Sequence, residues 1–317
     1  MASTLDADKP GCSAAVGIDG QVVWRGVRGL ADLAAQRPIT PDAVFDIGSV
    51  TKQFTAAAIL LLAQDGRLAT TDPVGEHLDG LPAWAQDTTL DSLIRHTSGL
   101  PDLFALMADA GVVPEQLFTQ ADALRLITAV PETTDRRGGY VYSNSGYVLL
   151  AEVVRAISGV PLPEFLQQRI FGPLGLTMTV GHLAAVPDKP TSYDRDDTAP
   201  GGFTAITPSQ FGVIGPGGIQ TTPSDLVRWG DNYRTGTVGG RALLDAQLAN
   251  PVRAGRALYG AGLDIEHDGD IGHGGGWHGF MTEFLVSADR HVTVAVTCNA
   301  RLSRALSATL LGLWTVS

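Results

Sequence analysis

Cysteine and lysine are both scarce in this chain of 317 residues. It contains 2 cysteines, Cys12 and Cys298, and its 22 basic residues include only the lysines Lys9, Lys52 and Lys189. Two cysteines are too few for a disulfide scaffold or a cysteine-rich zinc site, so we interpret them as buried free thiols. Because the remaining basic residues are all arginine, a lysine inside an apolar segment is conspicuous.

Charge of positive sign is also in short supply. Charged residues make up 17% of the chain, and the 22 basic residues stand against 33 acidic ones, for a net charge of −11. A protein without a surplus of positive charge is poorly suited to a phosphate backbone or an anionic membrane, so we expect neither as a partner. The hydrophobic content of 44% excludes a disordered chain or a coiled coil and indicates a globular protein.

Long hydrophobic runs are missing as well. The longest apolar stretch, residues 56–63, is far shorter than the roughly 20 residues that span a bilayer. The first residues also lack the basic start and apolar run of a secretory signal peptide. We therefore expect a cytoplasmic protein, and nothing in the composition indicates its oligomeric state. At roughly 150 residues per domain, the length suggests two domains or one composite fold.

Both ends of the chain have the pattern of antiparallel strands. Residues 12–18 and 21–27 flank Asp19-Gly20, a dipeptide typical of a two-residue hairpin. Residues 280–287 and 291–299 form a second apolar pair around a polar turn. The segment between these two pairs of strands is predicted to be mostly helical. Helices are expected at 91–95 and 146–157, from a cap at Thr222-Pro223 to about Tyr233, and at 301–313. We predict an α+β fold with one antiparallel sheet built from both chain ends, flanked by helices and carrying a mostly helical insertion.

The most informative local feature is Ser49 followed three residues later by Lys52. The segment 49–64 is rich in Ala and Leu, lacks Gly and Pro, and ends at Asp65-Gly66, which predicts a buried helix beginning at Ser49. A spacing of three places the two side chains on one helix face. A lysine desolvated by apolar neighbours gives up its proton readily and can activate a hydroxyl. Taken alone, Ser-x-x-Lys also occurs by chance in long chains.

Two further segments have polar or glycine-rich patterns suited to a site. Tyr142 and Asn144 stand just before a predicted helix, where they could relay a proton and bind a carbonyl, or form an ordinary helix cap. Residues 272–277 contain four glycines, one histidine and one tryptophan. Such a segment lets backbone approach a ligand closely, or forms a flexible loop around a hydrogen-bonded histidine.

In this order, the three segments resemble the serine β-lactamase and penicillin-binding-protein family, which carries Ser-x-x-Lys, then Tyr-x-Asn, then a His/Lys-x-Gly strand. Residues 45–56, 93–100, 215–226 and 272–280 are similar to the branch of class C β-lactamases, D-Ala-D-Ala carboxypeptidases and related esterases. The resemblance extends over about residues 10–298. It implies a β-lactamase/transpeptidase-like fold, with a sheet-containing domain of residues 1–67 and 211–317, a mostly helical domain of residues 68–210, and a site in the cleft between them.

The resemblance also implies a role for each matching residue. Ser49 becomes the acylated nucleophile, Lys52 its base and Tyr142 the proton relay that also serves deacylation, while Asn144 orients Lys52 and the substrate amide. The backbone NH groups of Ser49 and Gly276 become the oxyanion hole.

The third motif departs from that of efficient β-lactamases. His273-Gly274-Gly275 replaces Lys-Thr-Gly and lacks both the permanent cation and the hydroxyl that hold a substrate carboxylate. His273 would occupy the basic position, and Trp277 either lines the acyl pocket or covers the core.

We therefore expect a cofactor-free and metal-free serine hydrolase that forms an acyl-enzyme on Ser49 and acts on small esters or amides. Three alternatives remain. The acyl group could pass to an amine, as in an acyltransferase or peptide cyclase; the chain could be a true β-lactamase; or it could be an acyl-binding sensor that never turns over. Its expected partner is a small-molecule acyl substrate.

Overall fold

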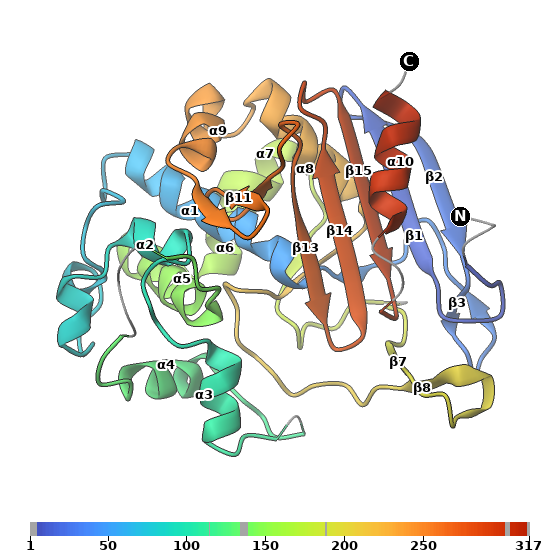
Figure 1. The fold of residues 1–317 in the computed structure, drawn as a ribbon, viewed down its shortest axis with the longest axis horizontal. Coiled ribbons are helices and arrows are strands. Elements are labelled where there is room, and N and C mark those ends of the chain that lie inside the picture. The colour runs from blue at the N-terminus through green and yellow to red at the C-terminus, as the bar shows by residue number, and fades with distance from the viewer. Residues whose placement is uncertain (1–4, 114, 134–138, 188, 302–304, 316–317) are drawn as a thin grey trace.

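The computed structural model describes residues 5–113, 115–133, 139–187, 189–301 and 305–315, and an eight-stranded antiparallel sheet lies at its centre (Figure 1). The first two strands of the chain lie beside the last strand, as predicted from the apolar patterns at both ends. In spatial order the strands are β10 (Val252–Ala254), β11 (Ala257–Tyr259), β12 (Asp264–Ile265), β13 (Ile271–Trp277), β14 (Phe280–Val286), β15 (Val292–Cys298), β1 (Cys12–Ile18) and β2 (Gln21–Arg28).

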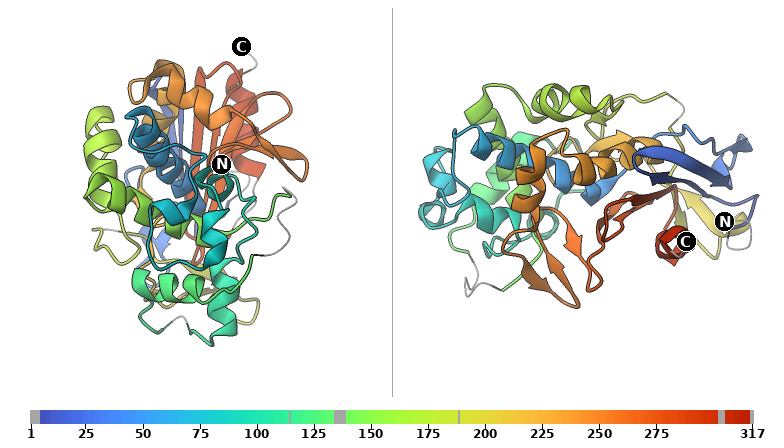
Figure 2. Two further views of the ribbon diagram at one scale, coloured as in Figure 1. Left: turned by 90° about the vertical axis from the view of Figure 1, so that its left-hand side faces the viewer. Right: turned by 90° about the horizontal axis from the view of Figure 1, so that it is seen from above.

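Helices cover both faces of this sheet, which confirms the predicted α+β class. Seen from above in Figure 2, α10 lies on one face while α8 and α1 lie on the other. The α-helices are α1 (Lys52–Gln64), α2 (Leu90–Ile94), α3 (Leu103–Asp109), α4 (Gln120–Thr128), α5 (Asn144–Ser158), α6 (Leu162–Leu166), α7 (Gly172–Leu174), α8 (Pro223–Thr235), α9 (Gly240–Leu248) and α10 (Ala305–Thr315). No helix in this described part of the chain is long and apolar enough to cross a bilayer.

Short elements connect the sheet with the helical part. A three-stranded sheet of order β5-β9-β6 leads directly into the turn that carries Ser49. The short strands are β3 (Leu30–Asp32), β4 (Arg37–Pro38), β5 (Phe45–Asp46), β6 (Thr179–Val180), β7 (Tyr193–Arg195), β8 (Phe203–Ala205) and β9 (Ile219–Thr221). The short helical turns are η1 (Gly48–Thr51), η2 (Val74–Glu76), η3 (Ala83–Gln86), η4 (Gln167–Phe171) and η5 (Pro200–Gly202).

Local sequence signals placed several of these elements correctly. Asp19 and Gly20 have φ values of 51° and 76°, as the tight hairpin between β1 and β2 requires. The Thr222 side chain accepts a hydrogen bond from the Asp225 backbone NH and caps α8, whose first residue is Pro223. The closing helix begins at 305 in the structure, and residues 302–304 of the predicted range lie outside the described residues.

One predicted element differs from the structure, and one open alternative is decided by it. The predicted helix does not begin as α-helix at Ser49, because residues 48–51 form the tighter turn η1 and α1 begins at Lys52. The glycine-rich segment of residues 272–277 is no flexible loop, because it forms most of β13 and pairs with β14 from Ile271 to Trp277. Glycine is unfavourable in strands, so its presence here indicates a close approach of another backbone.

The prediction of free thiols is wrong. Cys12 and Cys298 form a disulfide between β1 and β15, because the register of these strands places the two residues directly opposite each other. Their Cα atoms are 4.0 Å apart. The bond joins β1 and β15, which are the first and last strands in chain order but neighbours in the sheet, across 286 residues of sequence. Disulfides are typical of oxidising compartments, so this pairing does not support the cytoplasmic location expected from the sequence.

Candidate active site

Ser49 lies in the turn η1, between the small sheet and the buried helix α1. Gly48, the residue before it, has a φ of 51°, a conformation that glycine adopts at little cost. The Gly48 NH donates to Asp46 Oδ1 at 3.0 Å, which fixes the entry to the turn. Ser49 also lines a cavity of about 30 Å³ together with Asn144 and Gly276. The hydroxyl therefore faces a cleft rather than the protein core.

Lys52, the first residue of α1, contributes the second side chain of the site. Its side chain is fully buried, and its Nζ lies 3.1 Å from Ser49 Oγ, 2.8 Å from Asn144 Oδ1 and 2.8 Å from the Pro216 carbonyl oxygen. Burial lowers the pKa of Lys52 from 10.5 to about 7, although the negative charge of Asp102 acts in the opposite direction. Much of the amine is therefore neutral near pH 7.

The partners of Lys52 determine where the lone pair of that neutral amine points. The Pro216 carbonyl can only accept a hydrogen bond. Asn144 Nδ2 donates to Asp102 Oδ2 at 2.7 Å, so the Asn144 oxygen is the atom that faces Lys52 and it too can only accept. The two NH groups of the neutral amine go to these two oxygens. Ser49 is then the partner that can donate to the lone pair, which is the arrangement a general base needs.

Tyr142 contacts the same serine from the helical part. Its hydroxyl donates to Ser49 Oγ at 2.8 Å, although 93 residues separate the two positions. Burial raises the pKa of Tyr142 far above its ordinary value of 10.0, and the hydrogen bond to Ser49 acts against that rise. Tyr142 is therefore a neutral phenol at physiological pH, able to donate its proton but costly to ionise.

Asp102 is a site residue that the sequence reasoning missed. Its Oδ2 accepts hydrogen bonds from the backbone NH and the side-chain amide of Asn144, both at 2.7 Å. Its Oδ1 accepts from the Phe104 NH at 2.9 Å, so the same carboxylate caps helix α3. Asp102 follows a proline and precedes an apolar run, a pattern that predicts an N-cap. Nothing local to the segment indicates its contact with Asn144.

The strand β13 brings backbone to the nucleophile at its open edge. The ladder with β12 ends at Gly272, and beyond it the strand packs against η1. A Cβ atom on Gly275 would lie 1.9 Å from the Ile47 carbonyl oxygen, and one on Gly48 would lie 2.7 Å from the Gly276 nitrogen. Only glycines allow the two backbones to come this close. The NH groups of Ser49 and Gly276 are thus near each other, as an oxyanion hole would need.

His273 lies on β13 but does not supply a cation. Burial lowers its pKa from 6.5 to about 4, and the charge of Lys52 adds to this effect. Its Nδ1 lies 2.6 Å from the Gly274 carbonyl oxygen and its Nε2 lies 3.2 Å from the Tyr259 hydroxyl. The neutral imidazole therefore donates to the carbonyl and accepts from the tyrosine, and both ring nitrogens have protein partners.

Trp277 lines the cleft, and a larger apolar cavity adjoins it. Trp277, Phe104, Phe211 and Gly276 line both the space beside Ser49 and this neighbouring cavity of about 280 Å³. The other apolar residues of its wall are Met107, Val112, Val113 and Phe118. An aromatic or branched aliphatic group of a bound molecule would fit this space beside the nucleophile.

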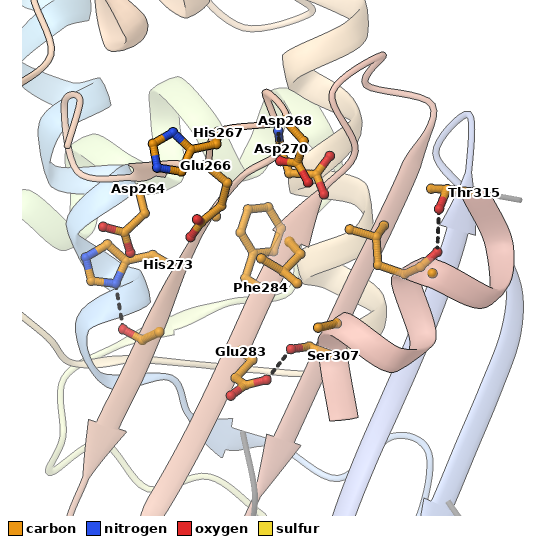
Figure 3. A pocket seen from close by; sticks show the side chains of 16 residues that line it. Asp264, Glu266, His267, Asp268, Asp270, His273, Glu283, Phe284, Ser307 and Thr315 are labelled. Atoms are coloured by element: carbon orange, nitrogen blue, oxygen red, sulfur yellow. Dashed lines mark hydrogen bonds between the residues drawn. The ribbon is translucent and has the colours of Figure 1, made fainter. Parts of the chain in front are cut away.

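A larger cavity lies elsewhere. It measures about 680 Å³ and lies between strands β12 to β14 and helix α10, as Figure 3 shows. Carboxylates dominate its polar lining, namely Asp264, Glu266, Asp268, Asp270 and Glu283. Burial raises the pKa of Asp264 to about 6. Ser49, Lys52 and Tyr142 do not line this cavity, so the candidate active site is the smaller cleft.

The whole chain matches a known family. The family model described as Beta-lactamase matches residues 2–311. Among curated proteins, penicillin-binding protein 4* of Bacillus subtilis is 27% identical over 306 residues, covering 88% of this chain and 66% of that protein. A D-aminopeptidase of Brucella suis is 30% identical over 301 residues, covering 92% of this chain and 56% of that protein. The chain therefore spans roughly half to two thirds of the length of these relatives.

Solved structures have the same fold. The octameric penicillin-binding protein homologue from Pyrococcus abyssi superimposes with a TM-score of 0.84 at 24% identity, covering 98% of this chain and 74% of that one. The D-amino acid amidase from Ochrobactrum anthropi SV3 in complex with D-phenylalanine gives a TM-score of 0.80 at 24% identity, covering 92% of this chain and 88% of that one. These matches confirm the predicted β-lactamase/transpeptidase-like fold.

Proposed function

The chain belongs to the β-lactamase family, and from that premise we propose that it is a serine hydrolase that cleaves small amides and esters through an acyl-enzyme on Ser49. One observation carries this proposal. The Ser49 hydroxyl lies within hydrogen-bond distance of both a buried lysine amine and a partly buried tyrosine hydroxyl. A nucleophile with a base and a proton donor on one oxygen is the minimum that acyl transfer requires.

Acylation would proceed by moving one proton around this group. Neutral Lys52 takes the proton of Ser49, and Oγ attacks the substrate carbonyl carbon. The carbonyl oxygen becomes negative and accepts hydrogen bonds from the NH groups of Ser49 and Gly276. As the bond to the leaving amine or alcohol breaks, Tyr142 donates its proton to that group and regains one from the Lys52 ammonium. The products are the free leaving group and an acyl ester on Ser49, with both catalytic side chains neutral again.

The shape of the cleft favours an apolar acyl group. The adjoining cavity of about 280 Å³ has an aromatic wall, and the neutral His273 supplies no positive charge. Relatives of this chain are named D-aminopeptidase and D-amino acid amidase. We therefore propose amides and esters of apolar D-amino acids, together with simple aliphatic esters, as the substrate class.

Steady-state kinetics with four substrates test this proposal. We expect D-phenylalanine amide and p-nitrophenyl butyrate to be hydrolysed, with L-phenylalanine amide and D-alanine amide turned over more slowly. Ser49→Ala should lose roughly three decades of kcat for each substrate. Ser158→Ala is a matched control, since Ser158 ends the helix that Asn144 begins, about 20 Å away along its axis. Activity that survives in Ser49→Ala would refute the proposed nucleophile.

A further inference from the structure

A histidine in the wall of the cleft and the buried aspartate that contacts it take no part in the chemistry described above. His182 Nδ1 is 2.6 Å from Asp46 Oδ2, and the two side chains are 2% and 0% exposed. His182 lines the same cavity of about 30 Å³ as Ser49 and Gly276. Burying such a pair is costly unless its geometry is good. Its position beside a nucleophile makes it a candidate for function.

The turn that carries His182 is held rigidly. The Gln220 side-chain amide donates to the carbonyl oxygens of Gly181 and Ala184, at 2.6 Å and 3.2 Å, and so fixes both ends of the turn. The imidazole stacks on the Trp277 ring with centroids 4.0 Å apart and planes inclined by 27°. These contacts leave the ring one orientation, which is what a proton-transfer group in a site needs.

The backbone at Gly217 passes close to the His182 ring. A Cβ atom on Gly217 would lie 3.2 Å from two atoms of the His182 ring, Cε1 and Nε2. The side of the ring that bears Nε2 thus lies against the loop of residues 216–217, and both of these residues line the same cavity as Ser49. Asp46 is held in place as well, because its other carboxylate oxygen, Oδ1, accepts a hydrogen bond from the Gly48 NH.

The aspartate determines which ring nitrogen carries the proton. A carboxylate can only accept a hydrogen bond, so in the neutral form of the ring the proton is on Nδ1, the nitrogen that faces Asp46. The lone pair is then on Nε2, and an imidazole oriented in this way is the commonest general base near neutral pH. A cavity of about 30 Å³ is large enough for one water molecule.

We infer that His182, oriented by Asp46, is the general base for the second half of the reaction, in which water attacks the acyl ester on Ser49. This inference rests on the proposed function. The histidine Nε2 takes a proton from water while the water oxygen bonds to the acyl carbon. When the intermediate collapses, the bond from that carbon to Ser49 Oγ breaks. Nε2 returns its proton to Oγ across the cavity that both groups line, which releases the free acid and restores the serine hydroxyl.

The two groups used in acylation both contact the serine oxygen, which is the leaving atom in this second step. The NH groups of Lys52 are directed to Asn144 and Pro216, and its lone pair faces the serine oxygen, which is now part of an ester without a proton. Tyr142 donates to that same oxygen and is costly to ionise. His182 lies in another part of the cavity wall and bonds to Asp46 rather than to the serine oxygen.

The variant His182→Asn tests the inference. An asparagine amide can replace the Nδ1 donor to Asp46 but offers no basic nitrogen. The matched control is His291→Asn, because His291 Nδ1 lies 2.6 Å from Asp19 Oδ1 in a pair that is about half exposed and does not line the cleft. Stopped-flow measurements with p-nitrophenyl butyrate separate the burst of acylation from steady turnover, and intact-mass measurements on acid-quenched enzyme give the acylated fraction. The melting temperature of each variant shows that it is folded.

We expect His182→Asn to keep its burst rate within about threefold, to lose about 10²-fold in steady turnover, and to accumulate enzyme carrying one butyryl group. Hydroxylamine, a nucleophile that needs no base, should restore turnover. His291→Asn should match the wild type in every measurement. Equal losses in both phases, or no loss in either, would overturn the role of His182. If the enzyme turned over at the wild-type rate while no variant carried an acyl group on Ser49, both the proposed function and this inference would be overturned.

Discussion

Replacing Asp102 with asparagine should move the pH at which the enzyme becomes active. The carboxylate of Asp102 holds Asn144 by two hydrogen bonds, and its negative charge favours the protonated form of Lys52. The base must be neutral to accept the Ser49 proton, so kcat/KM rises with pH through the Lys52 pKa of about 7 and is level above it. Asp102→Asn removes the opposing charge, and the pKa of Lys52 should fall further. The rise then occurs at lower pH.

The size of this effect follows from the hydrogen-bond chain. Asp102 and Lys52 are joined through the amide of Asn144 by hydrogen bonds of 2.7 Å and 2.8 Å, so we take the two charges to be about 7 Å apart in applying Coulomb's law. At an effective dielectric constant of about 20, their interaction is worth about 2 kcal/mol. That energy corresponds to a displacement of the acidic limb by more than about one pH unit. The plateau should also fall by about tenfold, because Asn144 loses a charge-assisted partner worth about 1.5 to 3 kcal/mol.

The assay is the pH dependence of kcat/KM for p-nitrophenyl butyrate between pH 5 and 9. Asp109→Asn is the control, because it removes an exposed carboxylate from the other end of the helix that Asp102 caps. Its profile should coincide with that of the wild type. An acidic limb that stays in place in Asp102→Asn, or that moves to higher pH, would show that the limb does not belong to Lys52.

Four further results are expected. Lys52→Arg should be almost as inactive as Lys52→Ala in ester hydrolysis, because a guanidinium does not give up its proton near neutrality; an arginine variant with more than about a tenth of the wild-type rate would contradict the role of the amine as base. Tyr142→Phe should keep the wild-type melting temperature and lose about 10²-fold in kcat, whereas an unchanged rate would leave the tyrosine a packing role. Thiol titration of the unreduced, denatured protein should find no reactive cysteine, and changing Cys12 and Cys298 to serine should lower the free energy of unfolding in urea by about 2 to 4 kcal/mol; two titratable thiols would refute the disulfide. Finally, nitrocefin should be hydrolysed with a kcat/KM about 10² to 10⁴ below that of p-nitrophenyl butyrate, because the third motif has a neutral His273 in place of a permanent cation and no hydroxyl to hold the carboxylate; equal rates would restore a β-lactamase as the leading function.

Local sequence patterns were sufficient where the structure depends on near neighbours. A spacing of three residues predicts that Ser49 and Lys52 come together, and the structure gives 3.1 Å between their side chains. The hairpin at Asp19-Gly20 and the cap at Thr222 follow equally local rules. Tyr142 could be assigned to the site only because the order of three motifs resembles a known family, since no local rule relates positions 93 residues apart.

Contacts between distant segments account for what the sequence did not predict. Asp102 was identifiable as a helix cap, but its hold on Asn144 depends on how two loops pack. The pair of Asp46 and His182 spans 136 residues and follows no spacing rule. The disulfide has a similar cause. Strands at both chain ends were predicted to share a sheet, yet the register that places Cys12 opposite Cys298 is set by packing along the whole of β1 and β15.

The most direct test of the central claim is the mass of the enzyme during turnover. Wild type and Ser49→Ala are mixed with p-nitrophenyl butyrate, quenched in acid within one turnover, and analysed intact and after proteolysis. We expect the wild type to gain one butyryl group, located on the peptide that contains Ser49, and Ser49→Ala to gain none and to release no p-nitrophenol above background. An adduct on another residue, or turnover that persists in Ser49→Ala, would contradict it.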